Sequence, residues 1–234
     1  MTRRQWARAA ATMIAATAAV SGGAAAAPTA AAQECPDVEV VFARGTSEAP
    51  GVGNVGQAFV DAVRAQAAPR TVGVYAVNYA ASNNFAARTE IAQTVIDGIN
   101  DESGHVQAMA ANCPNTRMVL GGYSQGALVS GFTTSDVVPA MVPTAIAPRP
   151  MPPAVADHVA AVVLFGTPSG TFLERYGAPA ITIGPRYEDK TLQLCAQGDT
   201  ICDGAPDGGP TVAHALYPVN GMVNEGAAYA VGRL

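Results

Sequence analysis

The amino-acid sequence predicts an α/β fold in which helices cover both faces of a parallel sheet. Short apolar runs typical of strands alternate along the chain with longer segments whose apolar residues recur at helical spacing. Such alternation is typical of strand–helix–strand units, whose right-handed crossovers place helices on both faces. With 234 residues, 49% of them hydrophobic, the chain is long enough for one domain with a buried core.

Local patterns place the individual elements. Short apolar runs bounded by proline, glycine or polar residues predict strands at 38–42, 72–77, 117–122, 159–165 and 191–195. Apolar residues at helical spacing predict helices around 52–63, 91–109, 125–138 and 221–231. Residues 139–153 contain six prolines, so we expect an ordered surface connection without regular helix or strand.

The first 32 residues are typical of a secretory signal peptide. An apolar run over residues 9–20 and a tract of small residues follow a basic start, which consists of Arg3, Arg4 and Arg8. We expect cleavage before Gln33, which leaves residues 33–234 as one mature domain. The alternative is an uncleaved membrane anchor, but the apolar run is short for a bilayer span of about 20 residues.

Charge limits the partners of the mature chain. Without the first 32 residues, ten basic and eighteen acidic side chains remain, a formal net charge of −8 with histidine neutral. A protein this acidic has no electrostatic reason to bind nucleic acid, so we expect no such partner. No later segment holds eighteen consecutive apolar residues, so we expect no other membrane span.

The four cysteines agree with export. An even number behind a signal peptide indicates disulfides, and Cys35, Cys113, Cys195 and Cys202 allow three pairings. Cys195 and Cys202 enclose a short loop rich in glycine and aspartate, so we expect these two to pair, which leaves Cys35 for Cys113. The alternative is a metal site, but paired C-x-x-C motifs are lacking and an oxidising compartment argues against it.

The pentapeptide Gly122-Tyr123-Ser124-Gln125-Gly126 has the pattern G-x-S-x-G between a predicted strand and a predicted helix. A strand that turns sharply into a helix holds the turning serine out at the sheet edge, and small flanking residues avoid clashes. The chain has 24 glycines, so a chance match is the alternative, but the strand before and the helix after favour a nucleophilic Ser124.

A serine nucleophile needs a base, and histidine is the usual one. In α/β-hydrolase order the chain runs nucleophile, acid, base. His105 precedes Ser124 in a predicted helix, where we expect a solvated side chain, and His158 lies before a strand, at the opposite sheet edge. His214, in a predicted loop, is the remaining candidate, and an ordinary surface histidine is its alternative interpretation.

The acid must lie between Ser124 and His214. The candidates are Asp136, Asp157, Glu174, Glu188, Asp189, Asp199, Asp203 and Asp207. Asp199 follows the last predicted strand and therefore lies at the same sheet edge as Ser124. A disulfide around it would fix its loop, as a group that orients an imidazole requires. Asp203 is the nearest rival, and an acid-rich turn without a catalytic role is the alternative for both.

A serine enzyme also needs backbone donors for the oxyanion. One is the N–H after the nucleophile, at Gln125. The other is expected in the loop after the first strand, residues 43–48, where Thr46 offers an amide and a hydroxyl. The alternative is that Thr46 and Ser47 are ordinary turn or helix-cap residues.

Several motifs, taken together, resemble the cutinase family of secreted serine esterases. They are Ala43-Arg44-Gly45-Thr46-Ser47-Glu48, Cys113-Pro114, the segment from Gly121 to Gly126, Cys195 through Gly198-Asp199 to Cys202, and Ala213-His214. The resemblance covers essentially the whole mature chain. The alanine-rich signal and Val77-Asn78-Tyr79 resemble the actinobacterial, especially the mycobacterial, branch.

The resemblance implies a small α/β-hydrolase, a three-layer sandwich with a five-stranded central parallel sheet, without a full lid and without a cofactor. It implies Ser124, Asp199 and His214 as the catalytic triad and Thr46 and Gln125 as the oxyanion hole. It further implies disulfides between Cys35 and Cys113 and between Cys195 and Cys202. We expect a secreted monomer that acts on a small-molecule or lipid ester and makes peripheral contact with a membrane or the cell envelope.

The chain departs from the family pattern in three places. Thr46 stands where fungal cutinases usually have serine, and residues 139–153 are longer than the family minimum. Residues 204–210 are polar and glycine-rich where the fungal enzymes carry bulkier apolar residues. Such a lip offers little apolar wall, so we expect a preference for short- to medium-chain esters and poor hydrolysis of cutin. The alternatives are a lipase, phospholipase or polysaccharide deacetylase, and a catalytically idle binding protein of the same fold.

Overall fold

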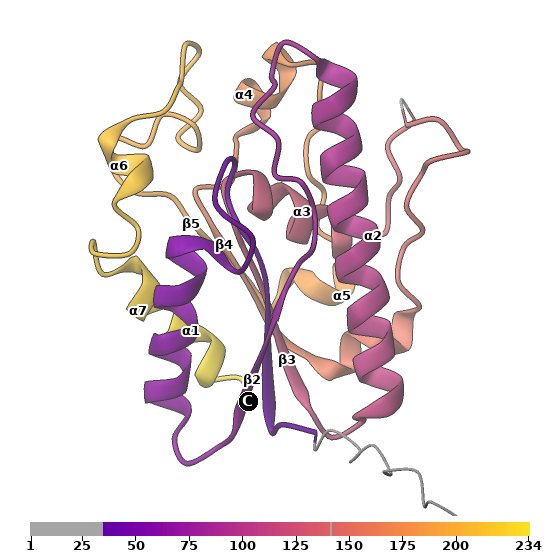
Figure 1. The fold of residues 1–234 in the computed structure, drawn as a ribbon, viewed down its shortest axis with the longest axis vertical. Helices are drawn as coiled ribbons and strands as arrows, with labels where there is room; N and C mark the ends of the chain where they lie inside the picture. Colours follow the sequence, from indigo (N-terminus) through magenta and orange to yellow (C-terminus); the bar gives the residue numbers. More distant parts are fainter. Residues whose placement is uncertain (1–34, 141) are drawn as a thin grey trace, which may run out of the picture. The chain divides into compact units, whose positions relative to one another are not determined.

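Five parallel strands form the central sheet of the described part of the chain (Figure 1). The computed structural model describes residues 35–140 and 142–234, so the expected signal peptide lies outside the described residues. The strands are β1 (Val38–Ala43), β2 (Val72–Ala76), β3 (Arg117–Tyr123), β4 (Val159–Phe165) and β5 (Thr191–Leu194). Their spatial order is β2-β1-β3-β4-β5 and every pairing is parallel, which confirms the predicted sheet.

Helices cover both faces of the sheet, as predicted. The four long helices are α1 (Gly53–Ala67), α2 (Arg88–Asn112), α3 (Gln125–Thr133) and α7 (Met222–Val231). Residues of α1 and α7 share a core with Val38, Val40 and Phe42, while residues of α2 and α3 share one with Val41 and Ala43. Successive strand residues point to opposite faces, so the fully buried strand β1 contributes to both cores.

The sequence patterns did not predict four short elements of the described structure. They are the 3-10 helix η1 (Pro153–His158) and the helices α4 (Gly170–Arg175), α5 (Pro185–Glu188) and α6 (Val212–Ala215). Each spans about two turns or fewer, which is too short to show apolar periodicity.

The helix expected over residues 125–138 ends at Thr133, so the last part of that prediction is wrong. The hydroxyl of Thr134 donates to the carbonyl oxygens of Ser130 and Gly131, at 3.1 and 3.0 Å. Such back-bonding competes with continuation of the helix. The chain then runs without helix or strand through the described residues between 135 and 152, as the prolines predict.

Both predicted disulfides are present. One joins Cys35, before β1, to Cys113, after α2, and the other joins Cys195 to Cys202 in the loop after β5. Among the described helices, none is both long enough and apolar enough to cross a bilayer.

Candidate active site

Ser124 lies at the turn between β3 and α3. Its backbone has φ 55° and ψ −116°, a costly conformation for a residue with a side chain. Its N–H donates to the carbonyl oxygen of Phe165 at the end of β4, at 2.9 Å. A Cβ atom at Gly126 would collide with the carbonyl group of Ala43, and one at Gly122 with the carbonyl group of Gly126. These two glycines therefore allow the strand, the turn and the helix to pack closely.

Ser124, His214 and Asp199 form an unbroken chain of hydrogen bonds. Nε2 of His214 lies 2.9 Å from Oγ of Ser124, and Nδ1 of His214 lies 2.8 Å from Oδ2 of Asp199. All three residues are buried, with exposed fractions of 9% for Ser124, 8% for His214 and 0% for Asp199. An ionised Asp199 accepts a hydrogen bond from the N–H of Nδ1, which leaves Nε2 without a proton and able to accept the hydroxyl proton of Ser124. The structure thus brings together the three residues that the sequence selected.

Asp199 is held by more than His214. The hydroxyl of Tyr217 donates to Oδ2 at 2.7 Å, and the N–H of Ile201 donates to Oδ1 at 3.2 Å. Burial favours the neutral acid, but the hydrogen bonds from His214 and Tyr217 outweigh it, so the pKa of Asp199 lies below its ordinary value. Asp199 is therefore a carboxylate at neutral pH.

His214 lies on the one-turn helix α6 and not in a loop, so that detail of the prediction is wrong. A helix this short is marginal alone, and contacts with its surroundings must hold it. Oγ1 of Thr211 accepts from the N–H of His214 at 3.3 Å and donates to the carbonyl oxygen of Gly198 at 2.9 Å. The hydroxyl of Tyr123 donates to the carbonyl oxygen of His214 at 2.6 Å. These contacts link α6 both to the loop of Asp199 and to the strand that precedes Ser124.

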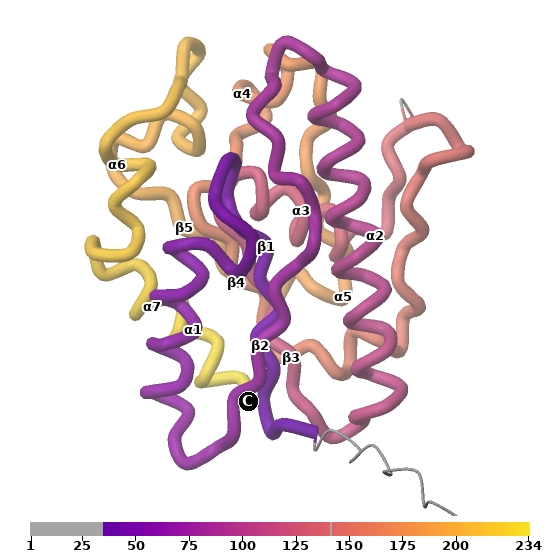
Figure 2. The backbone as a smooth tube through the Cα atoms, viewed as in Figure 1, coloured from indigo at the N-terminus to yellow at the C-terminus, as the bar shows by residue number. Residues whose placement is uncertain are grey.

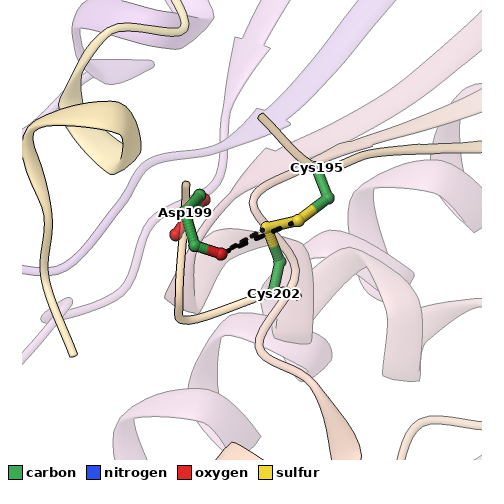
Figure 3. A group of neighbouring side chains, drawn as sticks. All are labelled: Cys195, Asp199 and Cys202. Carbon is green, nitrogen blue, oxygen red and sulfur yellow. Dashed lines mark hydrogen bonds between the residues drawn. A yellow bond between two sulfur atoms is a disulfide. The ribbon is translucent and has the colours of Figure 1, made fainter. Parts of the chain in front are cut away.

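The disulfide between Cys195 and Cys202 encloses Asp199 (Figure 3). The backbone oxygen of Asp199 lies 3.4 Å from Sγ of Cys202 and 3.8 Å from Sγ of Cys195. Cysteine and aspartate so close together resemble a metal site, since their ligand atoms lie within 4.8 Å of one another. Metal ligation requires thiolates, and the disulfide uses both sulfur atoms, so this cluster does not fit a metal centre.

The two residues expected to stabilise an oxyanion, Thr46 and Gln125, line the same cavity as Ser124. Gln125 is the first residue of α3, so its N–H has no partner inside the helix and is free for a ligand. Its side chain donates to the carbonyl oxygen of Ser82 at 3.0 Å, which ties α3 to the loop after β2.

A network around the buried Arg44 braces the loop that carries Thr46. Nε of Arg44 donates to the carbonyl oxygen of Glu48 at 2.9 Å, and its guanidinium also donates to the carbonyl oxygen of Tyr79. The hydroxyl of Tyr79 returns a hydrogen bond to the carbonyl oxygen of Arg44. The carboxylate of Glu48 accepts from the N–H of Gly45 at 2.6 Å. The position of Thr46 is therefore fixed by its neighbours on both sides.

The rejected candidates lie elsewhere. His158 directly precedes β4, at the amino edge of the sheet, as expected. His105 is not solvated as we expected, since Nε2 lies 2.8 Å from Oε2 of Glu39 and the ring stacks on Tyr75. Asp203 is exposed and accepts from the N–H of Ala205 at 2.9 Å, so it closes a turn.

Sequence reasoning missed Tyr217, Thr211 and Tyr123. No motif marks these residues, because each acts through a hydroxyl that the fold brings to a distant partner. Tyr217, four positions before Gly221, and Tyr123, directly before the motif serine, carry no pattern that distinguishes them from a tyrosine in the core. Only Thr211 had a signal, because a threonine before a helical turn is a common helix cap.

An apolar cavity of about 770 Å³ opens at Ser124 and His214. Residues 204–210 contribute only Pro210 to its lining, whereas Phe85 and several residues between 137 and 150 contribute apolar side chains. The lip adds little apolar wall, as expected, but other segments supply one, so the polar lip alone does not set the chain length that the cavity accepts. The chain-length preference itself stays a prediction.

The parallel sheet and the serine at its strand-to-helix turn define an α/β-hydrolase fold. The chain belongs to the cutinase family, whose family model matches residues 34–234. The solved structure of a Trichoderma reesei cutinase in complex with a phosphonate inhibitor superposes with a TM-score of 0.61, at 30% identity over 85% of this chain and 76% of that chain.

Relatives from Mycobacterium tuberculosis are closer in sequence. A probable carboxylesterase, Culp7, is 60% identical over 72% of this chain and 88% of its own length, and the carboxylesterase Culp1 is 45% identical over 100% and 98%. A phospholipase, Culp4, is 46% identical over 87% of this chain and 81% of its own length. The protein is accordingly a carboxylic ester hydrolase.

Proposed function

We propose that the protein is a secreted serine carboxylesterase that works through Ser124, His214 and Asp199. The observation that carries the proposal is the continuous hydrogen-bonded chain from Oγ of Ser124 through the imidazole to the carboxylate, with contacts of 2.9 and 2.8 Å. A hydroxyl is a weak nucleophile at neutral pH, and a positioned imidazole with an ionised acid behind it removes this limitation.

The reaction runs in two halves. Oγ of Ser124 attacks the ester carbonyl as its proton passes to Nε2 of His214, and Asp199 stabilises the imidazolium that forms. The backbone N–H groups of Thr46 and Gln125 bind the oxyanion. The imidazolium then protonates the leaving alcohol, and the acyl group stays on Ser124. Water, deprotonated by His214, attacks this acyl-enzyme, and the imidazolium returns the proton to Oγ of Ser124 as the acid leaves.

The first test replaces the three proposed residues and pairs His214 and Asp199 with rejected residues of the same type. Ser124→Ala, His214→Ala and Asp199→Ala should each lower turnover of a nitrophenyl ester, by about 10⁴-fold or more for Ser124→Ala, because a triad acts as a unit. The controls His158→Ala and Asp203→Ala should keep turnover. A serine-directed organophosphonate should add one label, on Ser124. A folded Ser124→Ala protein with near-normal turnover contradicts the proposal, and a wild-type protein that neither reacts nor takes the label is an idle binding protein.

The class of ester that the enzyme hydrolyses is a separate question from the catalytic residues. The sequence favours short- to medium-chain esters, because the lip at residues 204–210 is polar. The apolar cavity beside Ser124 favours the alternative, a lipase or phospholipase, and the relative named phospholipase supports the same alternative. Turnover of nitrophenyl esters, triglyceride and phospholipid, measured side by side, separates these activities.

We also propose that the signal peptide directs the chain out of the cell, where it acts as a monomer with peripheral contact to the envelope. The two disulfides support this location, since they persist in oxidising compartments. Amino-terminal sequencing of the exported protein should begin near Gln33, and the mass in solution should be that of one chain. Retention of the full-length chain in the membrane would show an uncleaved anchor.

A further inference from the structure

The cavity beside Ser124 follows one face of helix α2. The apolar residues of α2 that line it are Ile91, Ala92, Val95, Ile96 and Ile99, and spacings of three and four place them on one side of the helix. From α3, Leu128 and Phe132 line it in the same way. The two helices therefore form a continuous apolar floor that starts at the nucleophile.

The outer wall of the cavity consists of residues 138–140 and 142–150, which run beside α2 (Figure 2). Val138, Val142 and Ile146 line the cavity from this side, and Val138 and Ile146 are 37% and 44% exposed. In the described part of this segment, the backbone hydrogen bonds are local: the N–H of Val142 donates to Pro139 and that of Ile146 to Pro143. In the described part of the outer wall, apolar side chains therefore face the two helices across the cavity.

The length of the cavity sets the length of ligand that fits. Residues of α2 that line it run from Arg88 to Ile99, about 16 Å along the helix at 1.5 Å per residue. An extended peptide residue has three backbone bonds and spans at most about 3.6 Å, so an extended chain advances about 1.2 Å per bond. An extended alkyl chain of about 13 bonds thus matches this face.

We propose that the cavity between α2, α3 and the outer wall is an acyl site that selects esters of long unbranched fatty acids, of about twelve carbons or more. The inference rests on the proposed function, because the catalytic roles of Ser124 and His214 determine which way the bound ester lies in the cavity. Nε2 of His214 protonates the leaving oxygen, so the alcohol departs on the side of His214 and the polar lip at residues 204–210. The acyl carbon stays on Ser124, and its chain runs the other way, along the apolar floor.

The energetic expectation is a steady gain with chain length. A methylene that enters an apolar site contributes about 0.8 kcal/mol, which corresponds to about a fourfold rise in kcat/KM for each added methylene. The rise should continue until the cavity is full. If only the polar lip received the acyl chain, kcat/KM would stop rising after a few carbons.

The test measures kcat/KM for nitrophenyl esters with acyl chains of about 4 to 16 carbons, below the concentrations at which they aggregate. A matched series keeps a short acyl group and lengthens the alcohol. We expect the acyl series to rise through about twelve carbons and the alcohol series to stay nearly flat. A flat acyl series in an enzyme that turns over the shortest ester overturns the acyl site and leaves the proposed function intact. No turnover of any ester by the folded protein overturns the proposed function instead.

Two variants test the location. Val95→Phe fills the floor of the cavity and should lower the ratio of long-chain to short-chain kcat/KM by about tenfold or more. The control Gln93→Phe adds the same ring at an exposed position of α2 that does not line the cavity, and should leave the ratio unchanged. If Val95→Phe does not fold, Val142→Ser with Ile146→Ser removes apolar surface from the exposed outer wall and should lower the same ratio. A folded variant of either kind with a wild-type ratio, or one that lowers only the long-alcohol series, overturns the assignment.

Discussion

The hydroxyl of Tyr217 and Nδ1 of His214 bond the same carboxylate oxygen, Oδ2 of Asp199, at 2.7 and 2.8 Å. The hydroxyl oxygen of Tyr217 also accepts from the N–H of Ala196, at 2.9 Å, at the start of the Asp199 loop. Tyr217 is fully buried, and burial raises its pKa far above the ordinary range, so the phenol keeps its proton. Tyr217 therefore helps His214 to hold the carboxylate in one orientation.

Tyr217→Phe should lower kcat by about tenfold with little change in KM, because a carboxylate that has lost one of its donors stabilises the imidazolium less well. It should also lower the free energy of unfolding by about 1–3 kcal/mol, since the N–H of Ala196 loses its partner. Steady-state kinetics and urea unfolding measure the two effects. The matched control is Tyr229→Phe. Tyr229 lies on α7, and its ring packs against the guanidinium of Arg233. An unchanged kcat in Tyr217→Phe would show that the hydroxyl serves only the fold.

The disulfide between Cys195 and Cys202 should matter more for turnover than for stability. It closes a loop of 7 residues, against 78 for the bridge between Cys35 and Cys113. Loop-closure entropy then gives about 2 kcal/mol for the short loop and about 4 to 5 kcal/mol for the long one. Replacing both Cys195 and Cys202 by serine should lower kcat clearly and the melting temperature slightly, because the loop carries Asp199.

The matched control for this change is the double replacement of Cys35 and Cys113 by serine. It should lower the melting temperature more and, in the protein that remains folded, affect kcat less. Turnover and thermal unfolding of both double variants check the pair of expectations. Full turnover without the short bridge would mean that hydrogen bonds alone hold Asp199 in place.

The fold and the principal site residues could be predicted because each has a local pattern. The strands show as apolar runs, and Ser124, Asp199 and His214 follow from one motif, a small set of histidines and the chain order of such enzymes. Tyr217 could not be found in this way, since its partner is 18 positions away and the contact exists only after folding. The cavity could not be predicted either, because its wall at residues 138–140 and 142–150 is proline-rich, and such a sequence predicts only the absence of regular structure.

Gly126 is the position where the motif depends most on the absence of a side chain. A Cβ atom there would overlap the carbonyl group of Ala43, which belongs to the neighbouring strand β1 and can move little. Gly126→Ala should therefore prevent folding or lower stability by several kcal/mol, in the range of severe overpacking. The control Gly104→Ala, on α2, meets nothing within 4 Å and should be neutral or slightly stabilising. Thermal unfolding followed by circular dichroism compares the stabilities of the two variants. A Gly126→Ala protein with wild-type stability would show that β1 can shift to make room for the added methyl group.

Glu102 is a buried acid between α2 and α3 that the proposed reaction does not use. Its side chain is fully buried, and Oε2 accepts from the hydroxyls of Ser130 and Thr133 at 3.1 and 3.2 Å. Among the described residues, Oε1 has no hydrogen-bond partner and no cation pairs with the carboxyl group. Burial raises the pKa of Glu102 from 4.5 to about 8, so the folded protein keeps it protonated at neutral pH.

This shift makes stability depend on pH in a definite direction. Between about pH 4.5 and 8 the folded state binds a proton at Glu102 that the unfolded chain has released, so the free energy of unfolding falls as pH rises. The slope should be on the order of 1 kcal/mol per pH unit, and it should level off above about pH 8. Glu102→Gln has nearly the same shape and no titrating group. Its stability relative to wild type should therefore increase from pH 5 to pH 8 and stay constant above. Urea unfolding across this range measures the difference, with Glu225→Gln at an exposed position of α7 as the control. Parallel curves for wild type and Glu102→Gln would show that Glu102 is ionised in the folded protein.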